Sequence, residues 1–285
     1  MSIFYINGDY VAEENAVLNA RDLSILRGYG AFDFLRTYGR QPFRLDKNIA
    51  RLRRSCGLLE LDLVWSDEEI ADIVLETLRR NAHVSSDFNI RLVVTGGISN
   101  DNLIPDSEPS LLVLVQPIKA PPAIWYERGV KVITVANDRL VPEAKSIMYT
   151  PAIIAQKRAR KVGGIEALYK DDDDNVLEGT TVNIFAFMGN TLITPPTDGR
   201  ILPGITRMTV LEMAQEYYTI EERDLPYHEL LAADEIFMTA ANKQIVPVVT
   251  VDDHTIASGT VGEGTQHIMA LFAEITAKRA AGLVV

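Results

Sequence analysis

Residues 139–185 read RLVPEAKSIMYTPAIIAQKRARKVGGIEALYKDDDDNVLEGTTVNIF, and they carry the clearest signals of fold and chemistry in the chain. Lys145 stands just before a segment, 150–162, that favours a helix, and the glycine pair that follows is typical of a helix end. Two hairpins are expected next, with turns near 171–175 and 189–190. A helix followed by hairpins, rather than regular strand–helix–strand units, predicts the α+β class.

The N-terminal part predicts a smaller unit of mixed structure. Asn7-Gly8 between two short apolar runs is a strong hairpin signal. Asp46 and Ser66 each stand where a helix N-cap is expected. Strands are expected over 30–38, 42–45, 89–95 and 110–116.

A domain boundary is indicated by three prolines in PIKAPPA, residues 117–123. Proline-rich segments are stiff and extended, which suits a connector. We therefore expect a small α/β domain over 1–116, a linker over 117–129 and a larger domain over 130–285.

Composition excludes several classes of protein. The formal net charge of -11 argues against nucleic acid, whose binding needs a dense field of Lys and Arg. Cys56 is the single cysteine, so an internal disulfide is impossible. No apolar run approaches about 20 residues, and the first residues lack the pattern of a secretory signal. A cytoplasmic protein without nucleic-acid or membrane partners is expected.

Three features could carry chemistry together. Lys145 could form a Schiff base if its surroundings favoured the neutral amine. Glu178 could pair with a protonated ring nitrogen, and a predicted helix start at 204–206 could bind a phosphate through its backbone N–H groups. Each feature alone also fits an ordinary surface lysine, a solvated turn acid or a common helix start.

No metal site is predicted. The run from Asp171 to Asp174 lacks the alternating spacing of a calcium loop and fits a solvated hairpin tip better. The four histidines share no spacing typical of metal ligands.

Five ordered motifs resemble the class IV (fold-type IV) pyridoxal-phosphate aminotransferases. This family includes branched-chain amino acid aminotransferases, D-amino acid aminotransferases and aminodeoxychorismate lyase. The similarity covers nearly the whole chain. The motifs are Lys145 with Tyr149, Glu-Ala-Leu at 166–168, Leu-Glu-Gly-x-x-x-Asn-Ile-Phe at 177–185, Ile-Leu-Pro-Gly-Ile-Thr-Arg at 201–207 and Ala-Asp-Glu-Ile-Phe-Met-Thr at 233–239.

The resemblance implies a fold and an assembly. The fold would be that of D-amino acid aminotransferases, with the larger domain built on a barrel-like antiparallel sheet that binds the cofactor. Pyridoxal 5'-phosphate would lie between the domains, and the enzyme would be a homodimer.

The resemblance also implies residue roles. Lys145 would bind the cofactor as a Schiff base and move the proton between Cα and C4′. Glu178 would keep the pyridine nitrogen protonated, and Tyr149 would hydrogen-bond near the ring oxygen O3′. The phosphate would be bound by Arg51 and by the helix start of Gly204, Ile205 and Thr206.

The substrate site departs from the branched-chain pattern. Arg27 stands where those enzymes commonly have tyrosine, two residues before Tyr29, and Ala241 replaces a turn threonine. With Lys243, this gives two cations that would favour a substrate carboxylate. The run Ser-Ile-Leu-Arg-Gly-Tyr-Gly at 24–30 resembles an atypical D-amino acid aminotransferase group. Alternatively, Arg27 forms a surface or dimer ion pair and Lys243 is solvated.

The predicted function is therefore a transaminase. It would move an amino group from an α-amino acid, preferably a D-amino acid, to 2-oxoglutarate or pyruvate. Branched-chain L-amino acid transamination is the alternative, followed by aminodeoxychorismate lyase activity. A non-enzymatic protein that binds the cofactor is disfavoured because the whole set of catalytic residues is present.

Overall fold

The computed structural model describes residues 1–136 and 139–283 and divides into two compact units. Unit 1 comprises 1–119, 143–148 and the end of the chain from 276, whereas unit 2 comprises 120–142 and 149–275. The expected large domain, 130–285, includes residues 137–138 and 284–285, which lie outside the described part. The expected boundaries and the linker over 117–129 stay a prediction.

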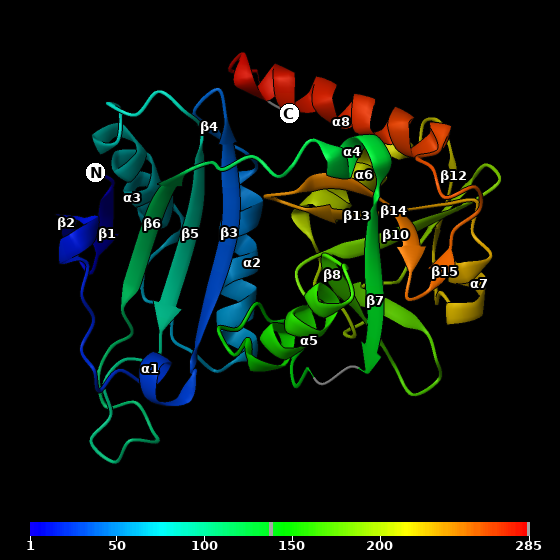
Figure 1. Cartoon of the computed structure of the whole chain (residues 1–285). Coiled ribbons are helices and arrows are strands. Elements are labelled where there is room, and N and C mark those ends of the chain that lie inside the picture. Colours follow the sequence, from blue (N-terminus) through cyan, green and yellow to red (C-terminus); the bar gives the residue numbers. More distant parts are fainter. Residues whose placement is uncertain (137–138, 284–285) are drawn as a thin grey trace. The chain divides into compact units, whose positions relative to one another are not determined.

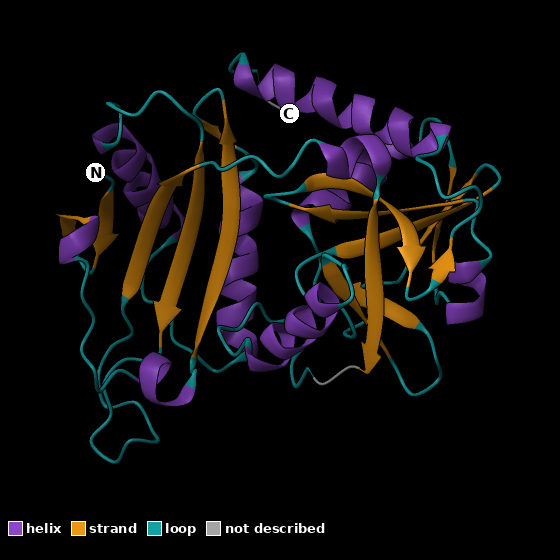
Figure 2. Ribbon diagram, in the orientation of Figure 1, coloured by secondary structure: helices purple, strands orange, loops and turns teal. Residues whose placement is uncertain are grey.

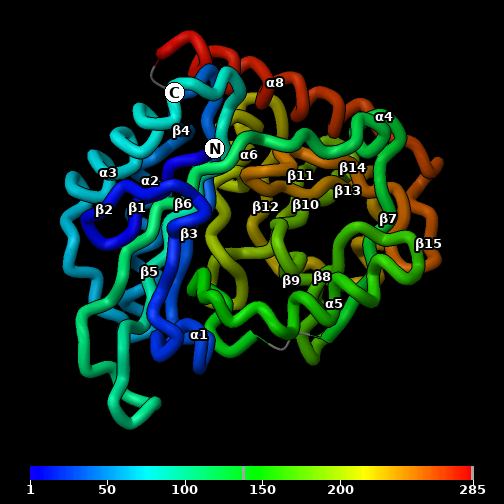
Figure 3. The backbone as a smooth tube through the Cα atoms, turned by 60° about the vertical axis from the view of Figure 1, so that its left-hand side comes forward, coloured from blue at the N-terminus to red at the C-terminus, as the bar shows by residue number. Residues whose placement is uncertain are grey.

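Unit 1 is built on a six-stranded sheet in the order β2-β1-β6-β5-β3-β4, with antiparallel neighbours throughout. Helices α2 and α3 pack on one face of it (Figures 1 and 3). The elements are β1 (Ile3–Ile6), β2 (Asp9–Ala12), a 3₁₀ turn (Glu13–Asn15), α1 (Leu23–Arg27), β3 (Gly30–Tyr38), β4 (Gln41–Pro42), α2 (Leu45–Leu58), α3 (Asp67–Arg80), β5 (Phe88–Thr95) and β6 (Leu111–Pro117).

The core of unit 1 follows from strand alternation. Ile90, Leu92 and Val94 recur at every second position of β5 and face the helices, where Leu52 and Val74 meet them, all fully buried. Burying an aliphatic side chain of this size contributes roughly 1.5–3 kcal/mol.

The two helix starts behave differently. Ser66 caps α3 as expected: its Oγ accepts the Glu69 N–H at 3.2 Å, and the Glu69 carboxylate accepts the Ser66 N–H at 2.7 Å. The expectation that Asp46 caps α2 is wrong. The helix begins at Leu45, because Arg44 adopts a left-handed conformation with φ of 50° and turns the chain directly into it. Asp46 lies within the first turn, where its charge still suits the helix dipole.

Unit 2 contains a nine-stranded sheet in the order β12-β11-β10-β13-β14-β7-β8-β9, with β15 added on β14. The sheet curls, since β9 at one end also contacts β10, and its strands cross steeply in Figure 2. The elements are α4 (Ile124–Arg128), β7 (Val130–Ala136), α5 (Thr150–Lys161), β8 (Glu166–Lys170), β9 (Val176–Gly179), β10 (Asn183–Met188), β11 (Thr191–Thr194), α6 (Ile205–Ala214), β12 (Thr219–Glu222), α7 (Tyr227–Leu231), β13 (Glu235–Ala240), β14 (Gln244–Val251), β15 (His254–Thr255) and α8 (Glu263–Ala280), whose last turn belongs to unit 1.

The curled sheet agrees with the expected fold but is mixed rather than wholly antiparallel. β7 runs parallel to both β8 and β14, and β11 runs parallel to β12. Parallel neighbours need a long crossover, which α5 supplies between β7 and β8. Ala155, Ala159 and Ala167 let α5 approach the sheet closely.

No helix in the described ranges, 1–136 and 139–283, combines the length and apolarity that a membrane span requires.

Candidate active site

Lys145 is held by its backbone in unit 1. The segment around it joins β3: the Phe32 N–H donates to the Lys145 carbonyl at 2.8 Å, and the Ile147 N–H donates to the Gly30 carbonyl at 3.1 Å. The Lys145 N–H in turn donates to Ser55 Oγ at 3.0 Å. Its Nζ lies 4.6 Å from the centroid of the Phe32 ring. The lysine therefore sits on a fixed backbone rather than on a loose loop.

Arg51 lies on α2, one turn from Ser55, whose hydroxyl donates to the Arg51 carbonyl at 2.9 Å. The guanidinium donates two hydrogen bonds to the Asp33 carboxylate, from Nε to Oδ2 at 2.8 Å and from Nη2 to Oδ1 at 2.9 Å. Asp33 is fully buried. This two-point contact fixes the orientation of the arginine that is predicted to bind the phosphate.

The two substrate residues predicted in unit 1 differ in their surroundings. Arg27 ends α1 and is exposed, with one guanidinium N–H donating to the Leu26 carbonyl at 3.0 Å. The Tyr29 hydroxyl points at the carbonyls of Leu59 and Glu60, 3.0 Å from each, at the end of α2. Burial, and then the charge of Glu60, raises the pKa of Tyr29.

Glu178 is the centre of a second group, in unit 2, and is only 4% exposed. Its Oε2 accepts the Asn183 amide at 3.2 Å, its Oε1 accepts the Leu202 N–H at 3.1 Å, and Arg139 forms an ion pair with it. Nearby, burial raises the pKa of Tyr169 to about 12, which keeps that phenol neutral. A buried carboxylate lined with donors can hold a cationic N–H on a ring.

The start of α6 is suited to an anion. Among the described residues no side-chain hydrogen bond caps it, and the first N–H groups of a helix, which have no partner within the helix, suit a bound anion. A Cβ on Gly204 would overlap the side-chain oxygen of Asn183, which explains the glycine there. Thr239 lies opposite Asn183 in the strand register and so on the same face. Its buried hydroxyl has no partner among the described residues, and Thr206 is also buried. These features fit a phosphate group.

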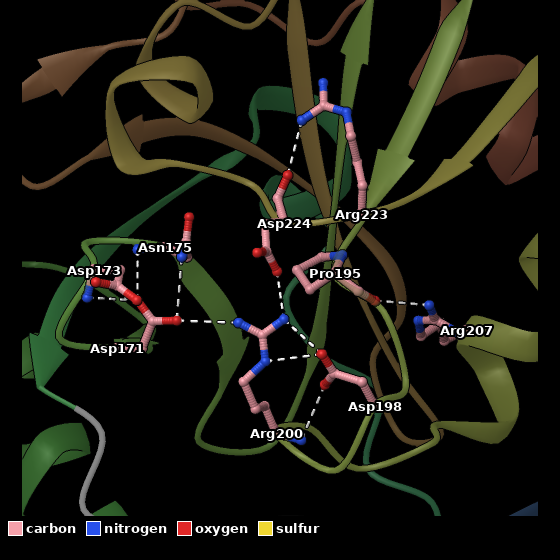
Figure 4. A network of polar contacts seen from close by, with 9 residues as sticks. All are labelled: Asp171, Asp173, Asn175, Pro195, Asp198, Arg200, Arg207, Arg223 and Asp224. Carbon is pink, nitrogen blue, oxygen red and sulfur yellow. Dashed lines mark hydrogen bonds and ion pairs between the residues drawn. The ribbon is translucent and has the colours of Figure 1, made fainter.

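The loop from 195 to 204, which delivers this helix start, is anchored by charges (Figure 4). Arg200 forms ion pairs with Asp171 at 3.2 Å, with Asp198 at 2.6 Å and with Asp224. At the other end, Arg207 donates to the Pro195 carbonyl at 2.8 Å. The hydrogen bonds from Arg200 lower the pKa of Asp198.

The remaining predicted residues also belong to unit 2. Lys243 is engaged: its Nζ lies 2.7 Å from Thr181 Oγ1 and 3.4 Å from Glu166 Oε2. Ala241 lies half-buried in the same turn, and Tyr149 is half-buried at the start of α5.

The structure thus brings Lys145, Arg51, Glu178 and the start of α6 together in two groups, and the other predicted residues belong to neither. Lys145 and Arg51 are joined through Ser55 in unit 1, together with the missed Asp33. Glu178 and the start of α6 are joined through Asn183 and Leu202 in unit 2. A charged residue inside the apolar run of β3 could have singled out Asp33 from the sequence, whereas Ser55 gives no such signal.

Comparisons with known proteins identify the family and the fold. The family model for class IV amino-transferases matches residues 30–251. A putative branched-chain-amino-acid aminotransferase from Methanocaldococcus jannaschii is 37% identical over 282 residues, covering 96% of each chain. A D-alanine aminotransferase from Bacillus licheniformis is 30% identical over 266 residues, covering 92% of this chain and 93% of its own. The fold is also that of the branched-chain amino acid aminotransferase of Escherichia coli, with a TM-score of 0.90 at 24% identity, covering 96% of this chain and 94% of that one. The chain therefore belongs to the class IV aminotransferases, enzymes that depend on pyridoxal 5'-phosphate.

Proposed function

We propose that this enzyme moves an amino group from a D-amino acid to a 2-oxo acid such as 2-oxoglutarate or pyruvate. The observation that carries the transamination is the environment of Glu178. This buried carboxylate is lined by the Asn183 amide and the Leu202 N–H, next to an uncapped helix start. An environment of this kind suits a phosphorylated ring with a protonated nitrogen.

Pyridoxal 5'-phosphate, when bound, supplies an aldehyde that takes up the amino group and a ring that withdraws electrons. We assign the ring nitrogen to Glu178 and the proton transfer between Cα and C4′ to Lys145. The phosphate is assigned to Arg51 and the N–H groups at Gly204, Ile205 and Thr206, and the ring oxygen O3′ to Tyr149.

The substrate carboxylate is assigned to Arg27. Its guanidinium is exposed and can grip a carboxylate at two points. Ala241 can contribute its backbone, and Tyr29 shapes the segment that presents Arg27. The ammonium of Lys243 is already satisfied by Glu166 and Thr181.

Lys145 is tested by Lys145→Ala, with Lys157→Ala, an exposed residue of α5, as the control. Loss of a proton-transfer group should lower kcat by roughly 10²–10⁴-fold or more. Borohydride reduction should fix the cofactor covalently to its lysine, and peptide mass spectrometry should find it on the Lys145 peptide in wild type and in the control. Full activity in Lys145→Ala would remove this residue from the mechanism.

A donor panel tests the substrate. D-alanine, D-glutamate, L-leucine and L-valine are each supplied with 2-oxoglutarate or pyruvate, and the 2-oxo acid product is measured. We expect turnover of the D-amino acids. Brisk turnover of L-leucine without either D-amino acid would instead establish the branched-chain alternative, which the Methanocaldococcus relative favours. Pyruvate released from aminodeoxychorismate without an amino acceptor would indicate the lyase.

A cytoplasmic homodimer is part of the proposal. Three segments of unit 1 expose large apolar side chains close to one another: α1, the loop at 99–107 and residue 148. The Arg21 guanidinium of the α1 segment donates to the Ser99 carbonyl at 3.0 Å, and Met148 packs beside Gly28. We call this surface the α1 patch. It consists of Ile25 (56% exposed), Leu26 (38%), Leu103 (66%), Ile104 (62%) and Met148 (51%).

A further inference from the structure

Glu166 is a carboxylate buried completely inside unit 2, at the start of β8. Its Oε1 accepts hydrogen bonds from the Gln156 amide and the Thr180 hydroxyl. Its Oε2 accepts the Thr181 hydroxyl at 2.6 Å and the Lys243 ammonium at 3.4 Å. These five residues form what we call the Glu166 network. A buried charge of this kind is tolerated only when it is paired and hydrogen-bonded.

Lys243 supplies the positive charge of this network. Its side chain is only 14% exposed, and its Nζ donates to Thr181 Oγ1 at 2.7 Å as well as to Glu166. The backbone of the same residue is fixed separately, because the Tyr126 hydroxyl donates to the Lys243 carbonyl at 2.8 Å. Both ends of the lysine are therefore held, and its charge is balanced within unit 2.

The network lies directly behind the turn that presents Glu178. Thr180 and Thr181 follow Glu178 after a single glycine, and the Thr180 N–H donates to the Ala167 carbonyl at 2.9 Å. A Cβ on Gly179 would stand 3.1 Å from Glu166 Cγ, so the backbone of the turn rests on Glu166. The Glu166 network therefore supports the backbone next to Glu178.

The network also reaches the turn between β13 and β14. Lys243 is the last residue of that turn, which also contains Ala241, the proposed backbone contact of the substrate. A substrate carboxylate at Lys243 would place a second negative charge beside Glu166, with one ammonium between the two. Repulsion between the two carboxylates opposes that arrangement.

We propose that Lys243 is a positioning residue, which ties the turn of the substrate side to the turn of Glu178 through Thr181 and Glu166. This inference rests on the proposed function. It removes Lys243 from the residues that bind the substrate, because the charge of Lys243 stabilises the carboxylate of Glu166 and not the carboxylate of the substrate.

The test is a double-mutant cycle on the holoenzyme, with Lys243→Met, Glu166→Gln and the double variant. Lys243→Met keeps the length of the side chain and removes the charge, and Glu166→Gln keeps the shape of the carboxylate. Lys157→Met is the control for loss of a surface lysine. The readouts are Tm, the rate of cofactor loss on dilution, and KM and kcat for one donor and one acceptor.

We expect Lys243→Met to lower Tm by about 5 °C or more, since it leaves a buried carboxylate without its cation. The cofactor should dissociate faster and kcat should fall roughly tenfold, while KM changes less than about threefold. The double variant should be more stable than Lys243→Met because no unpaired charge remains.

The proposal is overturned if Lys243→Met has the Tm of the control and raises KM for donor and acceptor roughly tenfold, the pattern of a lost substrate contact. Failure of the proposed function has a different signature. In that case wild type would transaminate no donor, while the Tm values of the three variants would still decide whether the Glu166 network stabilises the fold.

Discussion

The ion pair between Arg51 and Asp33 shows how much a single site residue depends on a partner. Asp33 is fully buried, and the Arg51 side chain is 8% exposed. When two charges are buried to this extent, removing either one leaves the other buried without a counter-charge, which destabilises the fold. The orientation of Arg51, and with it the proposed phosphate contact, therefore depends on a carboxylate of β3.

Asp33→Asn is expected to destabilise unit 1 by about 3–5 kcal/mol, the usual effect of breaking a buried pair from one side. The holoenzyme should also lose its cofactor faster, because the amide holds the guanidinium at one point instead of two. Urea unfolding measures the first effect and absorbance during dialysis the second. Asp72→Asn, at an exposed position of α3, is the matched control. Equal stability of the two variants would mean that Asp33 does not hold Arg51.

Among the elements, the loop from 195 to 204 connects surface charges to the candidate site. Arg200 binds three carboxylates at one end of it (Figure 4). Two residues further on, the Leu202 N–H donates to Glu178, and its carbonyl accepts the Asn183 amide. The ion pairs of Arg200 at the surface and the hydrogen bonds of Leu202 with Glu178 and Asn183 therefore hold the same short segment.

Arg200→Met should therefore lower stability in a pH-dependent way. Arg200 holds the pKa of Asp198 below its ordinary value in the folded chain. The charge of Asp198 stabilises the folded chain at pH values above about 4, the pKa of an aspartate in the unfolded chain. This stabilisation is lost as the pH falls through the lower pKa that Asp198 has in the folded chain. The free energies of unfolding of wild type and variant should thus differ most at neutral pH, by about 1 kcal/mol because these charges are partly exposed, and converge below about pH 4.

Urea unfolding at pH 7 and pH 3 measures this difference, with Arg160→Met on the exposed face of α5 as the control. A difference that stays constant between the two pH values would show that Arg200 acts through packing rather than charge.

Local signals in the sequence predicted most of these elements. The capping box at Ser66 and the hairpins at Asn7-Gly8 and Gly189-Asn190 depend on residues close in the chain, and all three are present. The start of α2 was misplaced because the left-handed Arg44 has no residue-type signal. The parallel neighbours of β7 were missed because they join distant segments, which periodicity within a window does not show.

The candidate site follows the same rule. Lys145 and Glu178 stand in motifs that can be recognised in the sequence. Their partners Ser55 and Leu202 depend on which segments the fold brings together, and neither residue type suggests a role in chemistry. Lys243 was predicted from its charge and from its place in the turn after the strand that ends near Thr239. Its neighbour Glu166 stands in a recognisable motif, but its complete burial and its pairing with Lys243 became visible only in the structure.

At the scale of the whole molecule, the α1 patch is the surface that the proposed assembly should cover. It gathers five large apolar side chains, each between 38% and 66% exposed, on segments that hydrogen bonds and packing join. Isolated exposed side chains are common, but clusters of them mark association sites. A second copy of the chain is the occupant that we propose, and Arg27 at the end of α1 would then lie at the edge of the interface.

The double variant Leu103→Ser with Ile104→Ser should therefore shift the enzyme from dimer to monomer at micromolar concentration. The loss of two large apolar contacts should cost the dimer roughly 2–4 kcal/mol, enough to weaken it by one to three orders of magnitude. Analytical ultracentrifugation measures the masses, and Val17→Ser, which changes a 74% exposed residue outside the patch, is the control. If the double variant sediments as a dimer with wild-type affinity, the subunits meet on another surface. A wild-type chain that is monomeric throughout would instead remove the dimer from the proposal, and Arg27 would then have to act within its own subunit.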